Sequence, residues 1–100
     1  VYDPVTDTWS TSPADMPTAR SSMYGAAAKG NLIYVIGGQN NGVQLTTNEF
    51  YTVPADTWTA DAPMPSGRAE MGVVSHGGRI YTVGGGFRGV SSNLNLVFKP

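Results

Sequence analysis

The 100-residue chain contains no cysteine, so it can form neither a disulfide nor a thiolate metal site or nucleophile. Charged residues make up only 13% of the chain and the formal net charge is −1, which provides no basic patch for nucleic acid. No apolar run approaches the roughly 20 residues that a membrane helix needs, and no secretory signal is visible. We therefore expect neither nucleic acid nor membrane among its partners, and the compartment stays unknown.

A helical period of useful length is also missing from every part of the chain. The sequence is instead rich in glycine, with 13 residues, and in threonine, asparagine and serine. Low charge combined with abundant glycine and β-forming residues predicts an all-β protein. A chain of this size buries only about 60–65% of its unfolded surface, so its stability alone is expected to be marginal.

The chain repeats itself with a period of about 48 residues, as three pairs of segments show. Each pair shares at least half of its residues at matching positions, and the small changes in spacing fall in connecting stretches, where structural repeats tolerate deletions. The pairs are "GNLIYVIGG" (30–38) with "GGRIYTVGG" (77–85), "YDPVTDTW" (2–9) with "YTVPADTW" (51–58), and "MPTAR" (16–20) with "MPSGR" (64–68). A third partial copy, "NLVFKP" (95–100), aligns with "NEFYTV" (48–53).

One period contains four short strand-like segments. In the first copy they are "GAAAKG" (25–30), "NLIYVIGG" (31–38), "TNEFYTV" (47–53) and "TWTA" (57–60). The run Leu32–Ile36 is apolar on both faces, which predicts a strand covered on both sides. Four antiparallel strands in each repeat are typical of a β-propeller blade. We predict third and fourth strands over 1–17, one complete blade over 18–65, and first to third strands over 66–100.

The order of the residues that recur in the two copies resembles the kelch repeat. A glycine doublet, a tyrosine, a tryptophan seven residues later, and then "MP" and an arginine follow one another. These positions are Gly37–Gly38, Tyr51, Trp58, Met64–Pro65 and Arg68, followed in the next copy by Gly84–Gly85 and by Phe98 in place of tyrosine. The resemblance covers the whole chain and implies about two kelch-type blades. The WD40 repeat is shorter and ends in Trp-Asp, a dipeptide that does not occur here.

Several repeated residues are expected to be structural. The glycine doublets end the second strand, where only glycine adopts the required backbone angles under crowding. Small residues in Ala26–Ala28 and Val73–Ser75 fit the narrow innermost position of a blade. Four aromatic residues are predicted to be buried between blades, namely Tyr34, Tyr81, Trp9 and Trp58.

Residues that could carry chemistry are scarce. The single histidine, His76, lies in a turn position and is interpreted as solvated. Gly84, Gly86 and Gly89 match G-x-G-x-x-G, but neither a helix nor an acidic residue about 20 positions later follows, as a dinucleotide site needs. We therefore predict no catalytic residue, no metal ligand and no cofactor, and a non-enzymatic binding scaffold. Because some kelch-like proteins are copper oxidases, sugar epimerases or hydrolases, the alternative is a fragment of a larger kelch-like enzyme or secreted carbohydrate-active protein.

One rim of the blades is the candidate binding surface, because the fourth-to-first and second-to-third connections share it. In kelch-like adaptors this rim receives partner peptides, so a peptide or carbohydrate ligand is expected here. The candidate residues are Arg20, Ser21, Ser22, Gln39, Asn40, Asn41, Arg68, Glu70, Phe87 and Arg88. For Arg20 and Arg68 the alternative is that both bind backbone carbonyls at the top of the blade.

Self-assembly is the last expectation. A propeller blade needs a neighbour on each face, and exposed strand edges recruit other chains. The "TWST" strand of one copy could complete the "NLNLVFK" blade of the next in a head-to-tail contact, which closes into a ring if the rotation allows. Since kelch-like propellers commonly have six or seven blades, two blades per chain favour a homotrimer. The alternative is that the remaining blades belong to the same parent chain.

Overall fold

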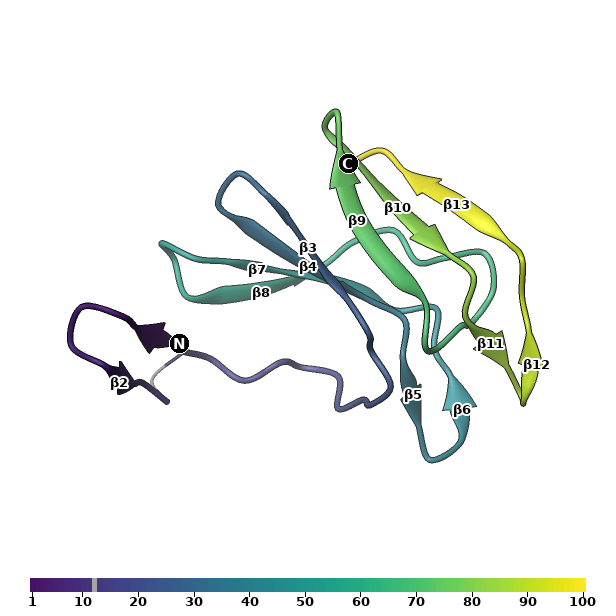
Figure 1. The fold of residues 1–100 in the computed structure, drawn as a ribbon, viewed down its shortest axis with the longest axis horizontal. Helices are drawn as coiled ribbons and strands as arrows, with labels where there is room; N and C mark the ends of the chain where they lie inside the picture. Colours follow the sequence, from purple (N-terminus) through teal and green to yellow (C-terminus); the bar gives the residue numbers. More distant parts are fainter. Residues whose placement is uncertain (12) are drawn as a thin grey trace.

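The computed structural model describes residues 1–11 and 13–100, which contain thirteen strands and no helix (Figure 1). No described helix is therefore long and apolar enough to span a membrane. The strands form one four-stranded sheet, one three-stranded sheet and three separate two-stranded hairpins. This confirms the predicted all-β fold of antiparallel sheets.

The four-stranded sheet follows the chain in order. It consists of β3 (Ala26–Lys29), β4 (Leu32–Ile36), β7 (Asn48–Thr52) and β8 (Thr57–Ala60), and all neighbours are antiparallel. The β7–β8 turn contains Asp56 at φ 53°, a left-handed conformation that aspartate tolerates better than most residues. The four segments predicted from residues 25–60 are thus all strands of one sheet.

The second sheet has three strands in the order β13-β10-β9. These are β9 (Gly72–His76), β10 (Arg79–Val83) and β13 (Asn95–Phe98), which correspond to β3, β4 and β7 one repeat earlier. Within the described residues, no strand pairs with β13 on the side away from β10, where β8 would stand in the first sheet. His76 is exposed at the end of β9, next to a turn, as predicted.

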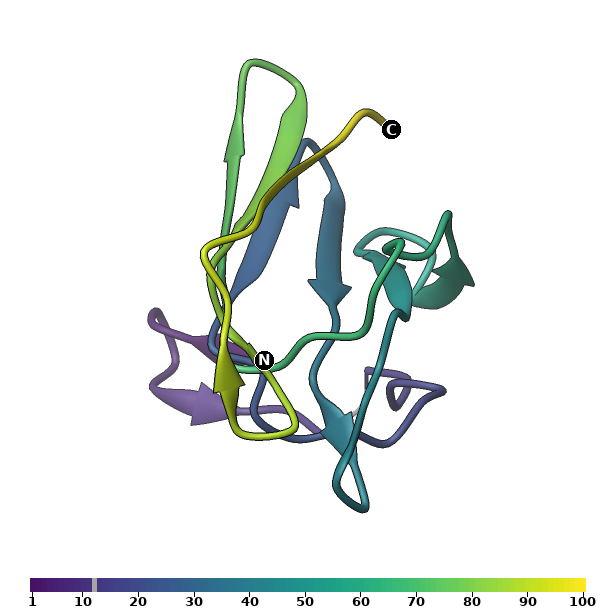
Figure 2. The same ribbon diagram turned by 90° about the vertical axis from the view of Figure 1, so that its right-hand side faces the viewer.

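Two further hairpins lie in the second-to-third connections, where the sequence had predicted only loops. They are β5 (Gln39–Asn40) with β6 (Val43–Gln44), and β11 (Gly86–Phe87) with β12 (Val90–Ser91). Both turns have positive φ at their two central residues, 49° and 78° in one and 51° and 77° in the other, as tight two-residue hairpin turns require. Figure 2 shows both hairpins extending from the same end of the two sheets.

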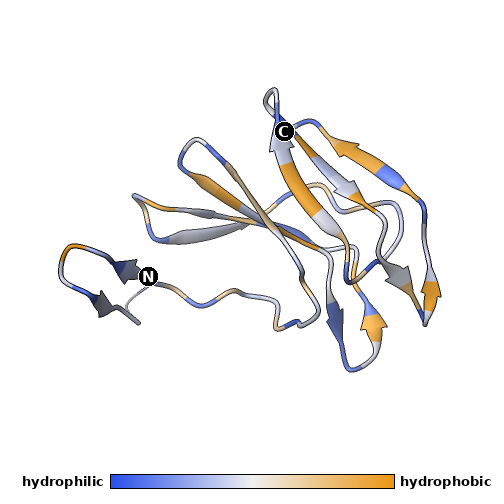
Figure 3. Cartoon of the chain, in the orientation of Figure 1, coloured by the Kyte–Doolittle hydropathy of each residue, from blue (hydrophilic) through white to orange (hydrophobic). Residues whose placement is uncertain are grey.

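The core lies between the two sheets. Its buried members are Ala27, Tyr34, Ile36, Met64, Met71 and Ile80. Tyr34 is 1% exposed and contacts Phe50 of its own sheet and Phe98 of the next, at ring-centroid distances of 5.3 and 5.9 Å. The innermost strands β3 and β9 lie against each other, and hydrophobic segments run along β9 and β13 (Figure 3). The predicted burial of Tyr34 is confirmed, while Tyr81 is only half-buried.

The glycine doublets stand at a close approach between the blades. Gly37 and Gly38 have φ values of 69° and 95°, and their counterparts Gly84 and Gly85 have 68° and 83°. A Cβ on Gly37 would lie 2.5 Å from the carbonyl oxygen of Arg68, nearer than a real side chain can come. The doublets therefore allow the backbone both to turn and to contact the neighbouring connection, which agrees with the structural role predicted for them.

The N-terminal hairpin corrects one prediction. It consists of β1 (Tyr2–Asp3) and β2 (Thr8–Trp9), which pair with each other and with no other strand in the described part of the chain. Trp9 is 79% exposed, so the prediction that it is buried is wrong for this structure. The physical reason is that no described first or second strand lies beside this hairpin to cover the indole. Trp58, the counterpart of Trp9 in β8, is half-buried.

Candidate functional site

The fourth-to-first and second-to-third connections meet at one rim of the blades. Ser21 and Gln39 exchange two backbone hydrogen bonds, both 2.8 Å long. Ala69 and Gly86 do the same one repeat later, at 3.1 and 2.9 Å. Each connection is therefore fixed to the first strand of the hairpin in its own blade, and the rim has a defined shape.

Hydrogen bonds also cross between the blades at this rim. The Gly38 N–H donates to the carbonyl of Arg68 at 2.9 Å, and the Glu70 N–H donates to the carbonyl of Ser22 at 2.8 Å. Ser22 and Glu70 occupy the same repeat position and both have positive φ, 56° and 60°. Backbone strain of this kind persists only where the surroundings hold it. The rim is consequently a rigid surface shared by both blades.

Arg20 points inward from the rim, and its side chain has no exposed area. Its guanidinium donates to the carbonyls of Thr47 and Val35 at 3.3 and 3.2 Å, and forms a 2.9 Å salt bridge with Glu49. The same carboxylate accepts a 2.6 Å hydrogen bond from the hydroxyl of Thr18. Burial lowers the pKa of Arg20, and the charge of Glu49 opposes this shift.

Arg68 occupies the same place in the next repeat and is 2% exposed. It donates to the carbonyls of Gly84 and Leu94 at 2.7 and 3.0 Å, and to the hydroxyl of Thr82 at 2.6 Å. Burial lowers its pKa. Both arginines thus bind the backbone ahead of the third strand. Their contacts are those of the alternative given above, in which both arginines bind backbone carbonyls at the top of the blade. Because both side chains are buried, neither guanidinium is available to a ligand on this rim.

Two of the remaining predicted rim residues, Gln39 and Glu70, line a cleft between the two blades. Its volume is about 540 Å³, and it lies between the β5–β6 and β11–β12 hairpins. The lining residues are Gln39, Gln44, Ala69, Glu70, Gly85, Gly86, Gly89, Val90, Ser91 and Ser92. The Oε1 atom of Gln44, one of these lining residues, is buried without a hydrogen-bond partner.

The tip of the β11–β12 hairpin beside this cleft carries an aromatic and a charged side chain. Phe87 is 44% exposed, and the Arg88 guanidinium lies over its ring, 5.1 Å from the centroid. The corresponding tip of β5–β6 carries Asn40 and Asn41, both exposed; Asn40 donates to the carbonyl of Ala19 at 2.9 Å. A shallow depression of about 260 Å³ beside it is lined by Ala19, Arg20, Ser21, Gln39, Asn40 and Asn41.

The predicted rim residues do not include Gln44, Ser91 and Ser92, which line the cleft. Gln44 and Ser91 lie in the second strands of hairpins that the sequence predicts as loops, and Ser92 follows directly after β12. The dipeptide Asn41–Gly42 is a known signal for a two-residue hairpin turn, and it would have revealed β5–β6. Nothing comparable marks Arg88–Gly89, because arginine is an unusual residue at positive φ.

The described residues contain no group of three or more histidine, cysteine, aspartate or glutamate side chains that could hold a metal ion. The rim offers amides, hydroxyls, one exposed carboxylate at Glu70 and one cation at Arg88. Such a surface can form hydrogen bonds and ion pairs with a bound segment, and the ring of Phe87 adds apolar contact.

Comparison with known proteins agrees with the geometry. The family model described as "Kelch motif" matches residues 20–65, which include β3, β4, β7 and β8. Similar proteins match nearly the whole chain: Beta-scruin of Limulus polyphemus is 38% identical over 96 residues, covering 95% of this chain, and Kelch-like protein 23 of Homo sapiens is 34% identical over 102 residues, covering all of it. The chain belongs to the kelch-repeat family.

Kelch-like protein 40 of Mus musculus is a further relative, 33% identical over 85 residues that cover 85% of this chain. The chain spans only 10% of Beta-scruin, 18% of Kelch-like protein 23 and 13% of Kelch-like protein 40. The similarity therefore extends over only a part of each of these proteins.

Proposed function

We propose that this chain is a non-enzymatic kelch module that binds a protein partner at the rim cleft. The observation that carries the proposal is the 540 Å³ cleft between two hairpins that project from neighbouring blades. Its lining of amides and hydroxyls suits the backbone of an extended peptide, which presents both donors and acceptors. Glu70 at the cleft favours a basic side chain in that peptide, and Phe87 beside it favours an apolar one.

Selection from a phage-displayed peptide library tests this function. We expect selected peptides to bind the chain with micromolar dissociation constants, measured by calorimetry. Phe87→Ala and Glu70→Gln should each weaken binding at least tenfold, because both act on the rim. The matched control is Val5→Ala, which changes a side chain that is 91% exposed and lies away from the rim. Binding that both rim variants leave unchanged would refute the site.

A carbohydrate ligand is the other outcome of the same experiment, since serine hydroxyls and an exposed ring also suit a sugar. A glycan array probed with the wild-type chain and with Phe87→Ala distinguishes the two. Glycan binding that is lost with Phe87→Ala, together with an empty peptide selection, would replace the peptide by a carbohydrate. The alternative that the chain is a fragment of a larger kelch-like enzyme is not favoured by any contact among the described residues.

A second proposal concerns assembly. Three copies of the chain, each with the blade boundaries 1–17, 18–65 and 66–100, would close a six-bladed ring. What supports it is that, among the described residues, β13 pairs with a strand only on its β10 side and the β1–β2 hairpin pairs with no other strand. Strand edges of this kind recruit other chains. Native mass spectrometry on the 10.5 kDa chain should show a trimer that dissociates when residues 1–12 are deleted. A dilution-resistant monomer would exclude the ring.

A further inference from the structure

The β5–β6 hairpin ends in a two-residue turn, Asn41–Gly42, that contacts little of the rest of the molecule. Asn41 is exposed, and its side-chain amide forms no hydrogen bond among the described residues. The Gly42 N–H likewise has no partner within this part of the chain. A Cβ on Gly42 would meet nothing within 4 Å, so the tip of the turn lies in open space. The side-chain amide carbon and the next backbone nitrogen are therefore both available for reaction.

These two groups can react with each other. When the Gly42 nitrogen attacks Cγ of Asn41, a bond between these atoms forms and the bond from Cγ to Nδ2 breaks. The amide nitrogen leaves as ammonia, together with the proton that the Gly42 nitrogen has lost. Water then opens the five-membered succinimide ring at either carbonyl, which yields aspartate or isoaspartate without any oxidant or reductant. Glycine hinders this attack least, because it has no side chain.

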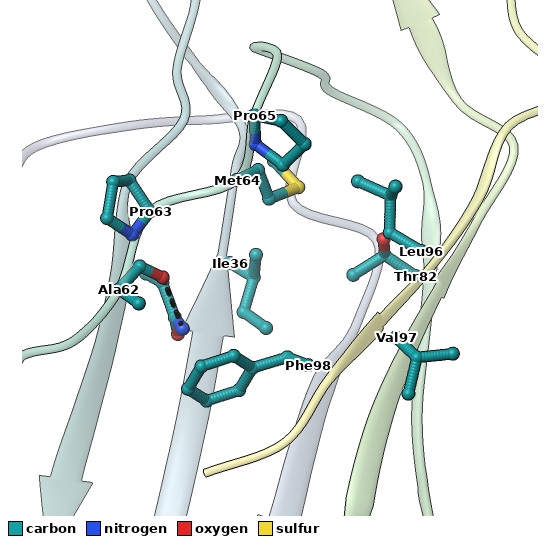
Figure 4. A pocket seen from close by; sticks show the side chains of 10 residues that line it. Ile36, Ala62, Pro63, Met64, Pro65, Thr82, Leu96, Val97 and Phe98 are labelled. Carbon is teal, nitrogen blue, oxygen red and sulfur yellow. Dashed lines mark hydrogen bonds between the residues drawn. The ribbon is translucent and has the colours of Figure 1, made fainter.

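The other asparagines of the chain lack this combination. Asn40 is followed by Asn41, and its Nδ2 donates to the carbonyl of Ala19 at 2.9 Å. Asn48 is 3% exposed beside a small apolar pocket, and its Nδ2 donates to the carbonyl of Ala62 at 3.0 Å, drawn as a dashed line in Figure 4. The asparagines that precede a leucine are Asn31, Asn93 and Asn95.

We propose that Asn41 is a self-modification site on the rim, where spontaneous deamidation through Gly42 replaces an amide by a carboxylate. The reaction requires the hairpin to open, because the turn fixes the backbone at φ 49° and 78°. Each strand of this hairpin has only two residues, so it should open more readily than the four-stranded sheet. The inference is independent of the proposed function and stands whether or not the cleft binds a peptide.

The two products change the rim in different ways. Aspartate keeps the backbone and takes the formal net charge of the chain from −1 to −2, because a neutral amide becomes a carboxylate. Isoaspartate instead carries the main chain through the side chain and adds one carbon to the two-residue turn. That extra carbon disturbs the pairing of Gln39 with Gln44, and both of these residues line the cleft.

The chain contains a matched control for this site. The β11–β12 hairpin has Arg88–Gly89 at its tip, with φ values of 51° and 77°. A Cβ on Gly89 would also meet nothing within 4 Å. The backbone is therefore almost the same, but no amide is present. Arg88→Asn should create a second modification site, and Asn41→Arg should remove the first.

Peptide mapping by mass spectrometry tests the site. After incubation of the folded wild-type chain in mildly alkaline buffer, we expect deamidation at Asn41 at least tenfold faster than at any other asparagine. Ion exchange should show acidic forms that accumulate in wild type and are absent from Asn41→Arg. Arg88→Asn should add a second site that reacts at a comparable rate. If Asn41 keeps its amide in the folded chain and loses it only in urea, the hairpin protects the residue and the proposal falls.

Two further measurements test the mechanism and its consequence. Gly42→Ala should slow deamidation of Asn41 at least tenfold, and an unchanged rate would exclude attack by the Gly42 nitrogen. Because alanine at positive φ distorts the turn, the Arg88→Asn site provides the independent check, and its failure to react would also count against the proposal. The Leu45 N–H, which donates to the carbonyl of Gly38 at 2.9 Å, reports on the hairpin. Its hydrogen exchange should be at least tenfold faster in the isoaspartate form than in Asn41→Asp, and equal rates would contradict the effect on the cleft.

Discussion

The two copies of the repeat bury an arginine at the same place but neutralise it differently. Arg20 is paired with Glu49, whereas Arg68 donates to two carbonyls and the hydroxyl of Thr82 and pairs with no carboxylate among the described residues. The residue corresponding to Glu49 in the second copy is Leu96. What both copies share is the bond to the carbonyl just before the third strand. The comparison teaches that the repeat fixes the backbone contact and leaves the counter-charge variable.

The largest effect is expected when the charged pair is broken. Arg20→Met leaves the carboxylate of Glu49 buried without its cation, which should lower the free energy of unfolding by about 3–5 kcal/mol in urea titrations. The double variant Arg20→Met/Glu49→Leu, which copies the leucine of the second repeat, should recover most of that loss. A double variant no more stable than Arg20→Met would show that the counter-charge is not the reason.

A smaller loss is expected at the other arginine. Arg68→Met leaves the carbonyls of Gly84 and Leu94 without this donor but leaves no buried charge unpaired. The free energy of unfolding should therefore fall by about 2–4 kcal/mol in the same titration. Because no carboxylate pairs with Arg68, adding Glu70→Gln should restore nothing. Recovery with Glu70→Gln would mean that the nearby carboxylate is the counter-charge after all.

Trp58 in β8 and Trp9 in β2 occupy the same repeat position, but Trp58 is half-buried and Trp9 is exposed, so they should contribute differently to stability. Trp58→Phe removes the hydrogen bond to the Ala14 carbonyl while it keeps an aromatic ring, so about 1 kcal/mol of stability should be lost. Trp9→Phe, measured in dilute solution where copies are separate, should cost less than about 0.5 kcal/mol because the side chain is exposed. Equal losses would contradict the difference between the two sites.

The smallest effect is a pH dependence that belongs to Asp56. The hydrogen bond from the Ala14 N–H, and then the one from Tyr51, hold the pKa of Asp56 below its usual value of 3.8. A depressed pKa means that the stabilisation is fully present above the unfolded-state pKa and is lost as the pH falls through the lower folded-state value. Urea midpoints measured from pH 6 to pH 2 should fall less steeply in Asp56→Asn than in wild type. Identical slopes would contradict the assignment.

The sequence predicted the sheets because each strand carries its own signal. The apolar run Leu32–Ile36, the repeated glycine doublets and the recurring Tyr–Trp pairs were sufficient to place four strands in a period. The two rim hairpins escaped because two-residue strands such as Gln39–Asn40 are too short to show alternation. The Asn41–Gly42 turn is the one local signal, and it marks only β5–β6. The bridges from Ser21 to Gln39 and from Ala69 to Gly86 that fix both hairpins are tertiary contacts, which the local pattern does not contain.

The arginines and tryptophans show the other limit of sequence reasoning. Arg68 and Arg20 occupy identical repeat positions, and nothing local distinguishes an arginine that faces solvent from one that turns inward to carbonyls. Trp9 and Trp58 likewise share the same local sequence, yet one is exposed and the other half-buried. Burial depends on which elements lie beside each strand, and a pattern within one repeat does not contain that information.

The hydrogen bonds that join the backbone of Ala14 to the side chains of Asp56 and Trp58 have a consequence for folding kinetics. Six of the eight strand pairs among the described residues join sequence neighbours, so their short loops close at low entropic cost and can form early. The bonds from Ala14 to Asp56 and Trp58 instead span 42 and 44 residues. They gain a partner only after β7 and β8 have formed. We therefore expect Trp58→Phe to accelerate unfolding and to leave the refolding rate almost unchanged, the behaviour of a contact made after the transition state.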